Sequence, residues 1–219
     1  MYLGVSAVLQ VGYTIFLAYA YRHGELAEVY PIVRGSVPLL VTLGSFAVVG
    51  QHLGASALLG ITLISLGIIG LNFGTTRASP KSVFLAIATG MFIASYVTAD
   101  GLGLRVSGNA QSYAIWIFLI YGALLPIVFL LLRGRPRADP LSPESLKAFS
   151  GGLLSFAAYV AITAALAVGK LGPVSALRET SVVFSALIGR FVLHETMTAQ
   201  RALACGAVTL GAACIGYSS

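Results

Sequence analysis

Long apolar runs separated by short polar connections fill almost all of this 219-residue sequence. Charged residues make up 9% of the chain and apolar residues 58%, whereas soluble domains carry about 25% charged residues. An α-helix needs about 20 apolar residues to cross a bilayer, and most of the runs reach that length. The sequence therefore predicts an all-α polytopic membrane protein without a large soluble domain.

The apolar runs predict eight transmembrane helices, joined mostly by short loops. We place them at residues 2–21, 27–49, 54–74, 82–100, 111–132, 147–169, 173–193 and 199–217. The longest connection contains Arg-Gly-Arg-Pro-Arg and Asp-Pro, which are typical of an exposed loop.

The sequence also repeats itself with an offset of 144 residues. This offset aligns Arg34 with Arg178, Leu43 with Leu187, Ala55 with Ala199, Leu59 with Leu203, Leu66 with Leu210 and Gly67 with Gly211. The first three helices thus match the last three, which lie five helices later. Because five is odd, matched helices cross the bilayer in opposite directions and form an inverted repeat.

The repeat predicts two units, residues 1–76 and residues 77–219. The second unit has five helices, so we expect an inverted five-plus-five repeat that lacks its first two helices. The alternative is a natural form with eight helices.

Arg34 and Arg178 lie well inside apolar runs, where a charge is costly and is therefore a functional candidate. Each lies roughly 10 Å into its helix, and the two enter from opposite faces of the membrane. Arginine donates two parallel hydrogen bonds to a carboxylate or phosphate, which favours binding or gating of an anionic metabolite. Alternatively, each arginine snorkels to its interface or bonds the backbone of neighbouring helices.

Glu179 follows Arg178 directly and allows two interpretations. It is either a proton carrier within the membrane or the ion-pair partner of Arg34, Arg178 or Lys170.

Three further residues interrupt apolar runs. Asp100 lies among glycines at the predicted end of the fourth helix, as a mobile gate or as a solvated helix end. Pro31 and Pro38 are expected to kink the second helix or to free its carbonyls toward a cavity, unless they serve packing alone.

Aromatic side chains offer stacking faces and hydroxyls for a cavity wall, or belong to the interfacial belt or to ordinary packing. The candidates are Tyr13, Tyr30, Tyr96, Trp116, Tyr121 and Tyr159.

Glycines are frequent in the third and last predicted helices, where they favour close packing between the repeats, with homodimerisation as a second use. Cys205 and Cys214 are about half a turn out of phase on one helix, so we expect neither a disulfide nor a shared metal.

Other function classes lack their signatures in this sequence. It has no glycine-rich phosphate loop with a lysine, no metal-ligand spacing of its three histidines and no nucleophile with a base, so we expect no enzyme, cofactor or metal site. The basic residues that give the net charge of +6 lie between apolar runs, which favours anionic lipid over nucleic acid. Their excess after the first, third, fifth and seventh helices predicts that these loops are cytoplasmic and both termini outside.

Four segments resemble the EamA-type members of the drug/metabolite transporter superfamily. They are Tyr-Pro-Ile-Val-Arg-Gly-Ser-Val-Pro at 30–38, Tyr-Val-Thr-Ala-Asp-Gly-Leu-Gly-Leu-Arg at 96–105, Ala-Leu-Arg-Glu-Thr-Ser at 176–181 and Leu-His-Glu-Thr-Met-Thr at 193–198. The resemblance implies ten helices in two inverted five-helix repeats. The sequence departs from this pattern in lacking the first two helices and in having Gln51 where the family has glutamate.

We therefore expect a secondary transporter that moves a small organic metabolite by alternating access, in the inner (plasma) membrane of a bacterium. Coupling to a proton or to an exchanged solute is left open. The alternative is a non-transporting truncated remnant, or a partner subunit that needs two helices from elsewhere.

Overall fold

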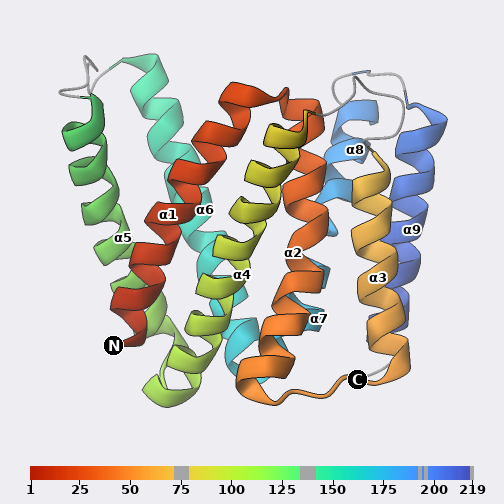
Figure 1. The fold of residues 1–219 in the computed structure, drawn as a ribbon, viewed down its shortest axis with the longest axis horizontal. Coiled ribbons are helices and arrows are strands. Elements are labelled where there is room, and N and C mark those ends of the chain that lie inside the picture. Colours follow the sequence, from red (N-terminus) through yellow and green to blue (C-terminus); the bar gives the residue numbers. More distant parts are fainter. Residues whose placement is uncertain (72–78, 134–141, 192–193, 195–196, 218–219) are drawn as a thin grey trace.

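The computed structural model describes residues 1–71, 79–133, 142–191, 194 and 197–217, and every regular element within them is a helix (Figure 1). The helices are α1 (Tyr2–His23), α2 (Leu26–Val49), α3 (Ala55–Gly70), α4 (Pro80–Ser107), α5 (Ala110–Arg133), α6 (Pro143–Val168), α7 (Leu171–Arg178), α8 (Ser181–Phe191) and α9 (Ala199–Gly216). Seven spans are long and apolar enough to cross a membrane, with α7 and α8 counted as one span, and α3 is a shorter apolar helix. The predicted all-α polytopic membrane protein is confirmed.

Successive spans run in opposite directions, so both chain termini lie at the same end of the bundle (Figure 1). We call this end the termini end and the other the opposite end. Arg22, Lys81, Arg133, Lys147 and Arg201 lie at or near the opposite end, whereas Arg105 and Lys170 lie toward the termini end. Arg77, Arg135 and Arg137 belong to the basic loops that predict the orientation, but they lie outside the described residues.

Two helix boundaries differ from the sequence-based expectation. Helix α4 continues to Ser107 instead of ending at residue 100, and it stops where Gly108 takes a left-handed conformation with φ of +66°. The predicted helix at 173–193 is interrupted after Arg178, so that α7 and α8 are separate helices. Both differences affect residues that the sequence marks as functional candidates.

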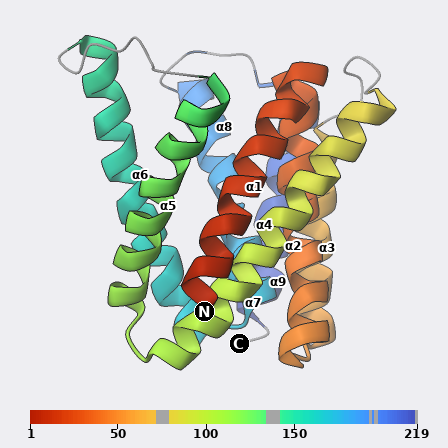
Figure 2. The ribbon, with the colours of Figure 1, turned by 60° about the vertical axis from the view of Figure 1, so that its left-hand side comes forward.

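The interior is built around α4, which packs against α1 and α2. Valines recur along the buried face of α2 at positions 29, 33, 37 and 41, a spacing that keeps them on one side of the helix. A second apolar cluster joins α3 to α9 through Ile61, Ile64, Ile68 and Val208. Helices α5 and α6 lie side by side at the edge of the bundle and carry many exposed apolar side chains, as lipid-facing helices do (Figure 2).

Glycines bring α3 and α9 into backbone contact. A Cβ atom on Gly60 would lie 2.5 Å from the Gly211 carbonyl oxygen, and one on Gly211 would lie 2.6 Å from the Gly60 carbonyl oxygen. The 144-residue offset aligns Gly60 with Ala204 and Gly211 with Gly67, so a symmetric bundle should also bring Gly67 close to Ala204. A Cβ on Gly67 would indeed lie 3.3 Å from the Ala204 carbonyl oxygen.

A second pair of contacts obeys the same rule. The Gly211 position approaches Ile64, and the offset converts this contact into the observed approach of Gly67 to Val208. Paired contacts of this kind are what a two-fold axis between α3 and α9 produces, which supports the predicted inverted repeat. The predicted boundary between residues 76 and 77 lies outside the described residues.

Substitution of Gly211 by alanine tests this helix contact. Because the new methyl group would overlap the Gly60 carbonyl, we expect Gly211→Ala to lower the free energy of unfolding by about 1–3 kcal/mol. Gly206→Ala, on the same helix and with open space at its Cβ, should be neutral or stabilising by at most about 1 kcal/mol. Unfolding of the purified protein in detergent measures both, and equal effects of the two substitutions would contradict the proposed contact.

Candidate functional site

A small polar cavity of about 80 Å³ lies in the centre of the bundle, where a membrane protein is otherwise apolar. It contains three charged side chains, Arg34 of α2, Arg178 of α7 and Glu179 of the α7–α8 connection. The other side chains that line it are Tyr13, Leu17, Tyr21, Tyr30, Val33, Val37, Ile93 and Tyr96. The cavity thus collects the two repeat-related arginines in one place.

Arg34 and Glu179 form an ion pair, with 3.3 Å between Nη1 of the arginine and Oε1 of the glutamate. The Glu179 side chain is 1% exposed and the Arg34 side chain 32% exposed. Of Arg34, Arg178 and Lys170, the ion-pair partner of Glu179 in the structure is therefore Arg34. Lys170 instead donates from Nζ to the His52 carbonyl oxygen over 3.1 Å.

The chain is not α-helical where Glu179 meets Arg34. The N–H of Glu179 donates to the Ala176 carbonyl and that of Thr180 to the Leu177 carbonyl, three residues back in each case. Such 3₁₀ bonds within a membrane span frequently mark functional hinges, and broken helices surround the binding sites of many transporters. The polar run Arg-Glu-Thr-Ser at 178–181 is the sequence signal for this interruption.

The interruption has a counterpart in the first repeat. Pro38 has no N–H to donate to the carbonyl of Arg34, four residues back. Val182, which the 144-residue offset aligns with Pro38, donates to the Glu179 carbonyl instead of to Arg178. Both arginines are therefore followed by a break in the regular helical hydrogen bonding, produced by proline in one repeat and by a 3₁₀ turn in the other.

The cavity retains unused capacity to bind a polar group. Among the described residues, Oε2 of Glu179 has no hydrogen-bond partner, and Arg178 has no carboxylate within ion-pair distance. The Arg178 side chain contacts Tyr96, whose ring lies 5.8 Å from that of Tyr13. Two arginines and one glutamate leave the site with an excess positive charge.

Asp100 lies in a separate buried cluster rather than at a solvated helix end, so that interpretation is wrong. Its side chain is 1% exposed, because α4 continues beyond it for two turns. Tyr113 donates to Oδ1 over 3.0 Å and Tyr159 donates to Oδ2 over 2.8 Å. Arg105 does not pair with this carboxylate but donates to the Gly169 carbonyl over 3.3 Å.

The other candidate residues are divided between the cavity and its surroundings. Tyr13, Tyr30 and Tyr96 line the central cavity, whereas Pro31 and Pro38 are buried in α2 outside its lining. Trp116 lines none of the cavities described here, because it is 58% exposed on the outer face of α5. Tyr121 contacts the hydroxyl of Thr14 over 3.0 Å. Sequence reasoning missed Tyr21 and Tyr113, which carry no signal beyond their residue type.

Contacts between helices close the bundle toward the termini end. Oε1 of Gln51 accepts a hydrogen bond of 3.1 Å from the backbone N–H of Leu171, at the start of α7. The Leu171 side chain packs directly against Gly101, and a Cβ on Gly172 would lie 2.5 Å from Oγ1 of Thr42. Gln51, the departure from the family pattern, therefore lies in this constriction and not in the cavity.

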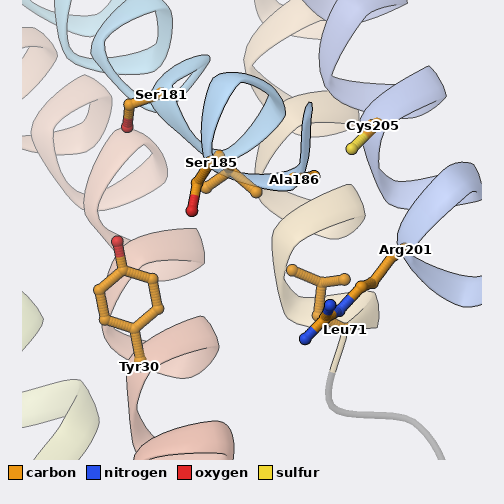
Figure 3. Close-up of a pocket in the computed structure, with 8 residues that line it drawn as sticks. Tyr30, Leu71, Ser181, Ser185, Ala186, Arg201 and Cys205 are labelled. Atoms are coloured by element: carbon orange, nitrogen blue, oxygen red, sulfur yellow. The ribbon is translucent and has the colours of Figure 1, made fainter. Parts of the chain in front are cut away.

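A second cavity of about 250 Å³ lies between α2, α3, α8 and α9 (Figure 3). Its lining residues are Tyr30, Leu71, Ser181, Val182, Ser185, Ala186, Arg201 and Cys205. Tyr30 lines both cavities, and the hydroxyl of Tyr30 points toward Ser181 and Ser185 (Figure 3). The guanidinium carbon of Arg34 lies 5.5 Å from the centre of the Tyr30 ring, so Tyr30 is shared between the outer cavity and the charged site.

The two native cysteines test whether water enters the outer cavity. Cys205 lines it, whereas Cys214 lies on the same helix near Gly60 in the contact with α3. A small hydrophilic thiol reagent should label the Cys214→Ser variant, which keeps Cys205, much faster than the Cys205→Ser variant, because the reaction requires access to the thiolate. Mass spectrometry of the membrane-embedded protein measures both rates, and equal rates would contradict a water-accessible cavity.

Comparison with known proteins gives one family and one fold. The model of the EamA-like transporter family matches residues 80–217, from the start of α4 to the end of α9. A crystal structure of a protein with 22% sequence identity has a TM-score of 0.79 and matches 97% of this chain and 74% of the other, which establishes a shared fold. The comparison with curated proteins gives no match. Since the family match extends over more than half of its length, the chain belongs to the EamA-like transporter family and is a membrane transporter.

Proposed function

We propose that this protein is a secondary transporter of a small organic metabolite that carries an anionic group, and that it works by alternating access. The observation that supports this most is the presence of two arginines and one glutamate in a central cavity of the membrane bundle. A charge at this depth is costly unless a partner compensates it. Arg178 has no acidic partner among the described residues, so an anionic substrate would supply one.

The geometry of the cavity favours a carboxylate or a phosphate over a neutral solute. An arginine fork donates two parallel hydrogen bonds to such a group. The substrate would bind Arg178 and compete with Glu179 for Arg34, whose ion pair is already partly exposed to the cavity. The tyrosines around the charges offer ring faces and hydroxyls to the remainder of the molecule.

The volume of the cavity implies a conformational step. Ligand pockets usually enclose about 300–1,000 Å³, and neither the central cavity of about 80 Å³ nor the outer one of about 250 Å³ reaches this range. Movement of the Tyr30 ring would join the two into a space of that size. We infer that the Glu179–Thr180 turn is the hinge that lets α7 and α8 move separately during this step.

The alternative of a non-transporting remnant or partner subunit is less well supported. Both arginines, Glu179 and the tyrosines around them come from this chain.

A ligand screen tests the proposal directly. A panel of carboxylated and phosphorylated metabolites, each beside its neutral amide or alcohol analogue, is scored by thermal stabilisation of the protein and by uptake into proteoliposomes. We expect at least one anionic compound to bind and its neutral analogue to fail. Arg34→Gln and Arg178→Gln should each weaken binding on the order of tenfold or more, the value of a hydrogen bond to a charged group.

Arg22→Gln is the matched control, because Arg22 is an exposed arginine at the end of α1. Its binding should equal that of the unmodified protein. Binding that is unchanged by Arg34→Gln and Arg178→Gln, or a substrate without an anionic group, would overturn the proposal.

A further inference from the structure

We propose that Asp100 is the proton-binding site of this transporter, and that it is physically separate from the arginine cavity. The proposal rests on the proposed transport function and assigns its coupling ion. The alternative for this role is Glu179, which is equally buried.

Glu179 and Asp100, the two most deeply buried acids among the described residues, have opposite surroundings. Glu179 is held beside the guanidinium of Arg34, so its negative charge is compensated within the protein. Asp100 is equally buried, yet its two oxygens meet the hydroxyls of Tyr113 and Tyr159, which are neutral donors. A carboxylate that lacks a cationic partner in a membrane interior becomes far less costly when it binds a proton.

Three helices packed near Asp100 present neutral side chains to it. Helix α5 supplies the hydroxyl of Tyr113, α6 supplies that of Tyr159, and α1 places Ser6 near the carboxylate. The amide of Gln10 in turn donates to Ser6 Oγ over 3.2 Å. On the α7 side, Leu171 packs against Gly101 beside it.

The nearest basic residues are engaged elsewhere. Arg105 of α4 donates to the Gly169 carbonyl, Lys170 donates to the His52 carbonyl, and Arg178 contacts Tyr96. Within the part of the chain that the structure describes, Asp100 consequently has no ion-pair partner.

The position of Asp100 suits a coupling role. It follows Tyr96, a wall of the arginine cavity, by one helical turn, or about 6 Å along α4. Its neighbour Gly101 is part of the constriction toward the termini end, through Leu171. Asp100 therefore lies between the cavity and the closed end, where alternating access would expose it to one side of the membrane and then to the other.

The chemical step is a reversible proton transfer. When Asp100 faces water on one side, its ionised carboxylate takes a proton from hydronium and forms an O–H bond. The neutral carboxyl group then donates to a tyrosine oxygen, whose hydroxyl rotates from donor to acceptor. After the conformational change the proton returns to water on the other side, so no other reactant is required.

Infrared difference spectroscopy tests proton binding without any substrate. The protein in lipid is taken through a step in pH, and the carbonyl stretch of a protonated carboxylic acid is followed. We expect a band that titrates, that is absent in Asp100→Asn and that remains in Glu179→Gln. Tyr159→Phe removes one donor to the ionised form, so the band should persist to a pH higher by about one to two units.

A transport measurement tests coupling with the radiolabelled carboxylates of the panel as the probe. In proteoliposomes, an imposed pH gradient should change the rate for the unmodified protein but not for Asp100→Asn, which should still exchange internal for external label. Absence of the titrating band, its persistence in Asp100→Asn, or an unchanged gradient response of that variant would overturn the proposal. If the carbonyl band of Asp100 titrates as expected but no compound is transported, the proposed transport function is refuted while proton binding by Asp100 stands.

Discussion

The ion pair between Arg34 and Glu179 is the interaction on which the centre of this protein depends. It joins α2 in the first three helices to the broken span of the last three, at a point where neither charge is tolerated alone. Glu179 is almost completely buried and lies in the 3₁₀ turn that directly follows Arg178. Loss of this pair would leave a buried carboxylate and two uncompensated arginines in the same small space.

The two copies of the repeat are similar in packing and different in chemistry. The α3–α9 contact follows the 144-residue offset at Gly60, Gly67 and Gly211, so this helix contact is close to symmetric. At the functional positions the copies diverge, because the offset aligns Glu179 with Gly35. A Cβ on Gly35 would lie 2.8 Å from the Ser65 carbonyl oxygen, so the first copy uses this position for close packing against α3. The second copy uses it for the charge that pairs with Arg34.

The sequence was sufficient to predict the all-helical membrane fold, because long apolar runs are a local feature. It was also sufficient to predict that Arg34 and Arg178 lie inside spans, because a charge within an apolar run is visible in the sequence. It was not sufficient for Asp100, since the extent of α4 is decided by the glycine at 108 and by packing against Leu171 rather than by apolar periodicity. The break at Glu179 also escaped prediction, although the polar run at 178–181 marks it, and the ion pair at the break joins residues 145 positions apart. The position of Trp116 on the exposed face of α5 could not be predicted either, since an aromatic residue in a span is compatible with either a cavity or the lipid face.

A double-mutant cycle on Arg34 and Glu179 tests the central ion pair most directly. The free energies of unfolding of Arg34→Gln, Glu179→Gln and the double variant are measured in the same detergent, with a parallel cycle on Arg178 and Glu179. Residues in direct contact couple by about 0.5–3 kcal/mol. We expect a coupling of that size between Arg34 and Glu179 and a smaller one between Arg178 and Glu179. Additive effects in the first cycle would show that the pair does not hold the two parts of the bundle together.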